Sequence, residues 1–238
     1  MTTTLMLLPG LMCDEAVWVP QVAALSPGVR CIVPAWGLLD SLTEMARKVL
    51  DGAPQGRFSV AGHSMGGRVA MEVQRLAPDR VERLALLDTG YKPLADGEAG
   101  ERERALRFGL LEIARAQGMR AMAEQWAGGM VHPDRLGTPL FEEVLAMISR
   151  SSPAQFAAQI NALLNRPDAG AHLGAIRCPT LVLCGREDSW SPVAQHEAIH
   201  AATPGASLVI VEHCGHMCTM EQPGEVNQAL AAWLATPT

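Results

Sequence analysis

A serine set between glycines is the clearest chemistry-bearing feature of this 238-residue chain. Residues 62–66 read Gly-His-Ser-Met-Gly, after a short β-prone run at 58–61 and before a stretch with apolar residues on one helical face. Glycines two residues before and after Ser64 leave room for a sharp strand-to-helix turn. Such a turn lifts the Ser64 hydroxyl above the sheet edge, beside the free N–H groups of a helix N-terminus. The pattern predicts a nucleophilic serine.

A base and an acid that would activate this serine follow strands later in the chain. Asp188 comes after the apolar run 179–184, and His216 comes after the run 207–211. Asp88, at the end of the run 81–88, is a rival acid. The carboxyl ends of parallel strands meet at one edge of a sheet, so these loops are expected to gather there. At this point both aspartates are candidates for the acid, and Asp88 could instead hold the turn that follows its strand.

Alternating strands and helices predict the sheet that positions these groups. Strands are expected at residues 4–8, 30–34, 58–61, 81–88, 179–184 and 207–211, with helices at 16–25, 41–50, 193–202 and 224–234. This alternation indicates βαβ units and a parallel sheet. Residues 91–174 contain no strand candidate and several amphipathic helices. We therefore expect an α/β core formed by 1–90 and 175–238, and a helical cap, or lid, formed by 91–174. Ser41 and Glu44 have the spacing of a capping box.

Five stretches together resemble the α/β-hydrolase superfamily, in its branch of small cap-bearing bacterial esterases and lactonases. They are LLPG near residue 10, AGHSMGG at 61–67, RVERLALLDT at 80–89, CPTLVLCGREDSWSP at 178–192 and HCGHMCTMEQP at 213–223. The resemblance implies a doubly wound, mostly parallel sheet with an inserted helical cap. Because the chain starts at the strand before LLPG, without the leading hairpin of larger members, about six strands are expected.

The resemblance also implies a role for each candidate residue. Ser64 would attack an acyl carbonyl, His216 would act as general base, and Asp188 would orient the imidazole. The oxyanion hole would use the backbone N–H groups of Met65 and Leu11. The first loop reads Pro9-Gly10 where many members have His-Gly, but a backbone donor survives that change. Five further residues are candidates for the pocket lining: Trp36, His63, Trp126, Trp190 and Met217.

These features predict a serine hydrolase of the carboxylesterase class that cleaves an ester of a small or medium apolar substrate. A lactonase or a thioesterase would use the same machinery. A ligand-binding or receptor-like protein with little turnover is the alternative of another class. Dehalogenase and epoxide hydrolase chemistry is disfavoured, because those relatives use an aspartate where this chain has Ser64. Carbon–carbon bond hydrolysis is disfavoured by Met217, where such relatives often have tryptophan.

The composition of the chain restricts its expected partners, cellular compartment and cofactors. The formal net charge is −6 and no basic run is present, so neither nucleic acid nor a membrane surface is an expected partner. The six cysteines form no C-x-x-C pair, which indicates reduced thiols in a cytoplasmic protein. The segment 196–200 reads His-Glu-Ala-Ile-His, a literal zinc motif, but it lacks a third ligand at the required spacing and fills the slot of a core helix. No metal or organic cofactor is therefore expected.

Overall fold

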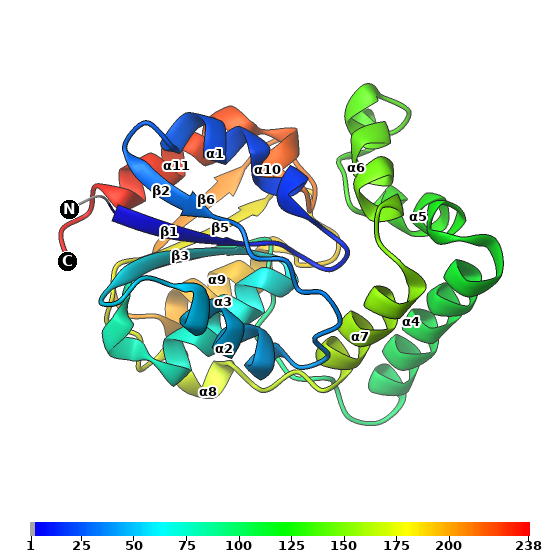
Figure 1. Ribbon diagram of the computed structural model, residues 1–238, viewed down its shortest axis with the longest axis horizontal. Coiled ribbons are helices and arrows are strands. Elements are labelled where there is room, and N and C mark those ends of the chain that lie inside the picture. The colour runs from blue at the N-terminus through cyan, green and yellow to red at the C-terminus, as the bar shows by residue number, and fades with distance from the viewer. Residues whose placement is uncertain (1–2) are drawn as a thin grey trace.

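A computed structural model describes residues 3–238, and its centre is a six-stranded sheet (Figure 1). All neighbouring strands are parallel, in the order β2-β1-β3-β4-β5-β6. The strands are β1 (Thr3–Leu8), β2 (Val29–Ile32), β3 (Phe58–His63), β4 (Val81–Leu87), β5 (Thr180–Gly185) and β6 (Ser207–Val211). Every residue of β3 and β5 is buried, as near-continuous apolar runs in the middle of a parallel sheet require. The predicted six-stranded parallel sheet is confirmed.

Helices cover both faces of the sheet. Figure 1 shows α1 and α11 on one face and α2, α3 and α9 on the other. The core helices are α1 (Val19–Leu25), α2 (Leu42–Gly52), α3 (Met65–Leu76), α9 (Val193–Ala202), α10 (Cys218–Glu221) and α11 (Pro223–Leu234). Two short 3₁₀ turns precede α1 and β4: η1 (Glu15–Trp18) and η2 (Pro78–Arg80). Together the layers enclose a buried apolar core in which Trp18 and Phe58 are the bulkiest side chains.

A run of helices joins β4 to β5. It comprises α4 (Glu98–Gln117), α5 (Met119–Trp126), η3 (Ala127–Gly129), η4 (Pro133–Arg135), α6 (Pro139–Ser149), α7 (Pro153–Leu164) and α8 (Gly170–Leu173). In Figure 1 the helices α4 to α7, drawn in green, stand beside the ends of the strands, whereas α8 lies with the core helices and contacts α9. The carboxyl edge of the sheet therefore faces α4 to α7.

Local details differ from the sequence expectations at three places. The helix expected at 16–25 begins as the 3₁₀ turn η1, and the short helices α8 and α10 were not expected. Ser41 occupies the N-cap position of α2, but its side chain makes no capping hydrogen bond with any residue of 3–238. The capping box of Ser41 and Glu44 is thus not formed. Thr43, which lies between these two residues, instead donates from its hydroxyl to the Glu72 carboxylate of α3.

Backbone strain is concentrated at the carboxyl edge of the sheet. Within residues 3–238, the non-glycine residues with positive φ are Met12, Ser64, Asp88 and His213. Ser64 and Asp88 directly follow β3 and β4, and the other two lie in the loops that follow β1 and β6. A non-glycine residue held in this region persists only where the surrounding structure fixes it, and such residues cluster at functional sites. The strain marks the edge where the candidate residues lie.

Within the described chain, no helix combines the length and apolar character needed to cross a lipid bilayer. All six cysteines are free thiols, and four of them are buried: Cys13, Cys184, Cys214 and Cys218.

Candidate active site

The turn that carries Ser64 depends on three glycines. Ser64 has φ 54° and ψ −116°, directly between β3 and α3. A methyl group on Gly62 would lie 2.2 Å from the Gly66 carbonyl oxygen, and one on Gly66 would lie 2.1 Å from the Leu8 carbonyl oxygen. A methyl group on Gly67 would lie 2.7 Å from Thr89. Only glycine lets the helix approach the strands this closely, and the close approach fixes the strained turn.

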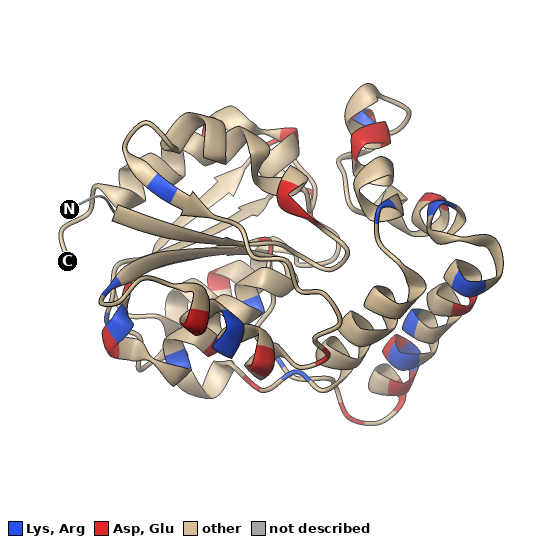
Figure 2. Cartoon of the chain, in the orientation of Figure 1, with Lys and Arg blue, Asp and Glu red and all other residues tan. Residues whose placement is uncertain are grey.

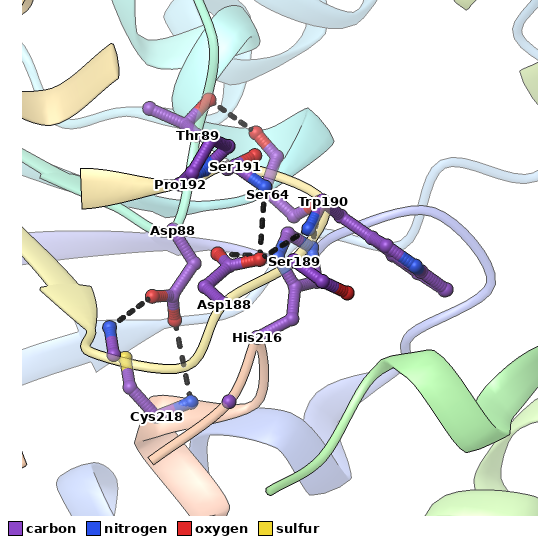
Figure 3. Close-up of polar contacts among 12 residues, drawn as sticks. Ser64, Asp88, Thr89, Asp188, Ser189, Trp190, Ser191, Pro192, His216 and Cys218 are labelled. Carbon is purple, nitrogen blue, oxygen red and sulfur yellow. Dashed lines mark hydrogen bonds and ion pairs between the residues drawn. The ribbon is translucent and has the colours of Figure 1, made fainter. Parts of the chain in front are cut away.

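Ser64, His216 and Asp188 form a continuous hydrogen-bonded chain (Figure 3). The Ser64 Oγ lies 2.8 Å from His216 Nε2, and His216 Nδ1 lies 2.8 Å from Asp188 Oδ2. Because the carboxylate accepts the Nδ1 proton, Nε2 is left free to accept the serine proton. The structure thus brings together the three residues that follow β3, β5 and β6, as their positions in the sequence predicted.

Backbone donors hold Asp188 in its charged form. Its Oδ1 accepts hydrogen bonds from the N–H groups of Trp190 (2.9 Å) and Ser191 (2.8 Å). Burial by itself would raise the pKa of Asp188, but His216 and these two donors hold that pKa below its ordinary value. Burial would likewise lower the pKa of His216, yet the charge and hydrogen bond of Asp188 raise it above its ordinary value. The pair is therefore arranged to stabilise an imidazolium.

Asp88, the rival acid, lies behind this chain and makes no hydrogen bond to His216. Its carboxyl oxygens accept from the N–H groups of Gly185 (3.0 Å) and Cys218 (3.3 Å), which ties β4 to β5 and to α10. Burial, with the charge of Asp188, raises the pKa of Asp88 to about 8. Its Oδ2 is 3.7 Å from Nε2 of His63, whose pKa burial lowers to about 3. Both groups are shifted toward their neutral forms, so this contact is not an ion pair.

The loop after β1 lies beside Ser64 and is fixed by a residue of α7. Leu11 and Met65 both line the cavity at Ser64, and Met65 opens α3, so its N–H has no partner within the helix. The next N–H along the loop, that of Met12, donates to Gln159 Oε1 at 2.8 Å. Met12 is one of the strained residues, so Gln159 holds the loop in a conformation it would not adopt freely. No sequence pattern had singled out Gln159.

Glu221 fixes the loop that carries His216. Its Oε1 accepts from the N–H groups of Gly215 (3.0 Å) and Met217 (3.2 Å), and its Oε2 accepts from the N–H of His132 at 2.7 Å. The N–H of His216 itself donates to the Met130 carbonyl oxygen at 2.8 Å. Residues 130–132 therefore help to position the imidazole, although they belong to the helical insertion.

A cavity of about 820 Å³ opens at Ser64 and His216. Of the expected lining residues, His63, Trp126 and Trp190 line it. The rings of Trp126 and Trp190 stack with centroids 5.0 Å apart, and Trp190 lies 5.1 Å from the His216 ring. Phe156 continues this aromatic wall at 6.1 Å from Trp126. One side of the cavity is thus apolar and reaches the imidazole.

Two expected lining residues lie elsewhere. The Trp36 side chain is buried beside the first loop and donates from Nε1 to the Pro9 carbonyl oxygen at 3.0 Å, so it supports that loop from behind. Met217 is fully buried, because the turn into α10 directs it into the core and not toward the cavity. The cavity lining also contains charged residues that had not been expected there: Arg68, Lys92, Glu103, Arg107 and Arg166.

The zinc-like segment belongs to the core. His196 is fully buried on α9, where its Nε2 accepts from the Thr89 N–H at 2.9 Å and its Nδ1 lies 3.3 Å from the Pro192 carbonyl oxygen. Burial lowers the pKa of His196 to about 4. Across residues 3–238, no group of three or more His, Cys, Asp and Glu side chains is arranged to hold a metal ion. His196 instead fastens α9 to the turn after β4.

Comparison with known proteins agrees with this geometry. A family model described as the alpha/beta hydrolase family matches residues 5–229. The chain belongs to the α/β-hydrolase family. One relative is a pimeloyl-[acyl-carrier protein] methyl ester esterase of Nitrosomonas europaea, 30% identical over 224 residues, with 89% of this chain and 88% of the relative covered. Another is a putative carbamate hydrolase of Escherichia coli, 27% identical, with 97% of this chain and 90% of the relative covered.

Solved structures of this family have the same fold. A thermophilic esterase from Thermogutta terrifontis matches with a TM-score of 0.86 and 28% identity, over 98% of this chain and 89% of that one. An enol-lactonase from Burkholderia xenovorans also matches with a TM-score of 0.86, over 99% of this chain and 92% of that one; its identity of 22% supports the fold alone. As a member of this family the protein is a hydrolase, and it is similar to bacterial esterases.

Proposed function

We propose that this α/β-hydrolase is a serine hydrolase that cleaves carboxylic esters through an acyl-enzyme. The observation that carries the proposal is the unbroken chain Ser64 Oγ–His216 Nε2 and His216 Nδ1–Asp188 Oδ2, with both contacts at 2.8 Å. A neutral serine hydroxyl is a weak nucleophile, and a base in hydrogen-bond contact with it is what activates it. The strained turn at Ser64 presents the hydroxyl to the cavity.

In the proposed acylation step, Ser64 Oγ attacks the ester carbonyl carbon while His216 Nε2 accepts the hydroxyl proton. Negative charge develops on the carbonyl oxygen, and the N–H groups of Leu11 and Met65 stabilise it. Collapse of the tetrahedral intermediate breaks the bond to the alcohol oxygen, which takes the proton from His216. The acyl group is then bonded to Ser64 Oγ. Asp188 stabilises the imidazolium that exists between these two proton transfers.

Deacylation repeats the same steps with water as the nucleophile. His216 accepts a proton from water, the resulting hydroxide attacks the acyl carbonyl, and Ser64 Oγ leaves with the proton from His216. The products are a carboxylic acid and the free serine. Lactones and thioesters react through the same atoms, so the triad does not discriminate among these three bonds.

The cavity supports a substrate of small or medium size with an apolar portion. Its volume of about 820 Å³ lies within the ordinary range for small-molecule sites. The aromatic wall of Phe156, Trp126 and Trp190 leads to His216, which places an apolar group next to the reacting carbonyl. Similarity to the methyl ester esterase of Nitrosomonas europaea favours an oxygen ester. We propose that residues 91–174 act as the lid of this cavity.

The proposal is tested with a fluorophosphonate probe and a short p-nitrophenyl ester. We expect the probe to label Ser64 and the wild-type protein to hydrolyse p-nitrophenyl hexanoate. Ser64→Ala should abolish both, whereas Ser149→Ala, which removes a hydroxyl on α6 that bonds only to the Leu145 carbonyl, should keep both. A wild-type protein that neither labels nor hydrolyses esters would leave the receptor-like alternative as the better description.

A further inference from the structure

A cluster of charged side chains also lines the cavity. We call it the cationic wall; it consists of Arg68 on α3, Glu103 and Arg107 on α4, and Arg166 after α7. These segments are far apart in the sequence, and Figure 2 shows charged residues of both signs along α4. The wall contains three guanidinium groups and one carboxylate, so it carries a net positive charge within a protein whose net charge is −6.

The single carboxylate of this wall is fully used by two of the arginines. Arg107 donates to Glu103 Oε1 from Nε (3.0 Å) and Nη2 (2.8 Å). Arg166 donates to Oε1 from Nη1 (2.7 Å) and to Oε2 from Nη2 (2.8 Å). These two arginines hold the pKa of Glu103 at about 2, against the opposing effect of burial, so it remains ionised. The single negative charge of Glu103 therefore balances one of these two positive charges, and no carboxylate oxygen of Glu103 is left to pair with Arg68.

Arg68 lacks an anionic partner. Its Nη1 donates to the Lys92 carbonyl oxygen at 2.8 Å, and no carboxylate of residues 3–238 lies within ion-pair distance of its guanidinium. Arg68 is the fourth residue of α3, where the positive end of the helix dipole disfavours a cation. Burial, followed by the charge of Arg166, lowers the pKa of Arg68 to about 9. Arg68 is a half-buried cation at the cavity, and no carboxylate of the described residues pairs with it.

The position of Arg68 connects it to the nucleophile. Arg68 lies in the first turn of α3, four residues after Ser64, and both residues line the same cavity. The absence of a side chain at Gly90 leaves space for the guanidinium, because a methyl group there would lie 2.6 Å from Arg68 Nη2. A molecule bound in this cavity can therefore contact Ser64 with one group and Arg68 with another.

We propose that the substrate carries a carboxylate at a distance from its ester group, and that Arg68 binds this carboxylate with the support of Arg107 and Arg166. The inference rests on the proposed ester hydrolysis at Ser64 and specifies its substrate class. A guanidinium presents two parallel N–H groups that match the two oxygens of a carboxylate. The substrate then carries an ester group at one end and an anionic group at the other: a monoester of a dicarboxylic acid.

Two matched esters test the inference. Mono-p-nitrophenyl adipate carries the carboxylate, and p-nitrophenyl hexanoate has the same acyl length without it. We expect the wild-type protein to have a higher kcat/KM for the adipate ester than for the hexanoate ester. Arg68→Gln should lower the ratio of these two kcat/KM values roughly 10- to 100-fold, which is the range expected for the loss of a hydrogen bond to a charged group. Arg102→Gln, which removes an exposed arginine of α4 paired with Glu98, should leave the ratio unchanged. An unchanged ratio in Arg68→Gln would overturn the carboxylate site while ester hydrolysis stands.

Binding separates this inference from the proposed activity. In Ser64→Ala protein, adipate should raise the melting temperature, and this shift should disappear in the double variant Ser64→Ala/Arg68→Gln. That result would support the anion site even if the wild-type protein cleaved neither ester, which would count against the esterase proposal alone. Inorganic phosphate is the comparison ligand. Equal or greater protection by phosphate would overturn the assignment to a carboxylate, as would adipate protection that persists without Arg68.

Discussion

Gln159 Oε1 accepts the N–H of Met12 at 2.8 Å, so a side chain of α7 holds the loop that follows the first strand. The two residues are 147 positions apart in the chain. Met12 has a positive φ and adjoins Leu11, the proposed oxyanion donor. The helical insertion therefore does more than cover the cavity, because it sets the position of a group proposed to stabilise the transition state.

Removing this contact should impair turnover more than substrate binding. We expect Gln159→Leu to lower kcat for p-nitrophenyl hexanoate roughly 10- to 100-fold, as small displacements of catalytic groups do, with a smaller effect on KM. Asn161→Ala is the matched control on the same helix, since Asn161 bonds to Asp40 outside the cavity. Equal kcat values for Gln159→Leu and wild type would show that Leu11 needs no such support.

The two buried aspartates should respond differently to the same substitution. Asp188→Asn removes the acceptor of the His216 Nδ1 proton and should lower kcat by roughly 10⁴-fold. Asp88→Asn should have a much smaller effect, because the Asp88 carboxyl accepts only backbone N–H groups and its pKa is raised to about 8. Steady-state kinetics of both purified variants measure this. A collapse of activity in Asp88→Asn alone would reverse the assignment of the acid.

Asp88 should also make stability depend on pH. A carboxyl whose pKa is higher in the folded state than in the unfolded state binds more protons when folded, so its contribution to stability declines as pH rises. For Asp88 that decline falls between about pH 4 and its folded-state pKa of about 8. Urea unfolding of wild type and Asp88→Asn across this range is the measurement. The stability of wild type relative to Asp88→Asn should fall toward alkaline pH, and a constant difference would contradict the shift.

The proposed base should set the acidic limb of the pH–rate profile. His216 must be neutral to accept the serine proton, and Asp188 raises its pKa above the ordinary histidine value of about 6.5. Activity should therefore increase with pH, with the midpoint of kcat/KM above 6.5. Initial rates with p-nitrophenyl hexanoate, corrected for spontaneous hydrolysis, give the profile. A midpoint well below 6.5 would mean that the titrating group is not an imidazole paired with a carboxylate.

Glu221 should contribute to both stability and turnover. Its two oxygens accept three backbone N–H groups, from His132, Gly215 and Met217. Glu221→Gln would turn an N–H₂ group toward at least one of these donors, at a cost of about 1–3 kcal/mol in the free energy of unfolding. We expect a lower melting temperature and a reduced kcat, with Glu225→Gln, on the neighbouring helix, as the control. Unchanged unfolding would show that the loop is held by its other contacts.

Two glycine-to-alanine substitutions should have opposite effects on stability, because one glycine is closely packed and the other is not. Gly66→Ala would place a methyl group 2.1 Å from the Leu8 carbonyl oxygen, and we expect a loss of about 3 kcal/mol or failure to fold. Gly109→Ala, in α4, meets no atom within 4 Å and should raise stability by about 0.5–1 kcal/mol. Thermal unfolding of both variants checks this. Similar behaviour of the two would contradict the packing at the nucleophile turn.

The fold could be predicted from the order of residues along the chain, because the patterns that indicate it are local. Buried strands separated by helices require a parallel sheet, and glycines around Ser64 require a tight strand-to-helix turn. The places of Asp188 and His216 after strands also follow from order along the chain. Since parallel strands end at one edge, these residues had to approach Ser64, and the structure brings them to hydrogen-bond distance.

The side chains that support and line the site could not be predicted in the same way, because they are brought together by the packing of distant segments. Two of these side chains contact residues far away in the sequence: Gln159 accepts from Met12, and Glu221 accepts from His132. The third, Arg68, lines the cavity because of the direction in which its side chain leaves α3. A local sequence pattern encodes neither kind of information. Trp36 and Met217 were expected in the cavity from their neighbours in sequence, yet each turns into the core. The charged side of the cavity exists because α3, α4 and the end of α7 converge. Such convergence depends on packing, and residue order alone does not specify it.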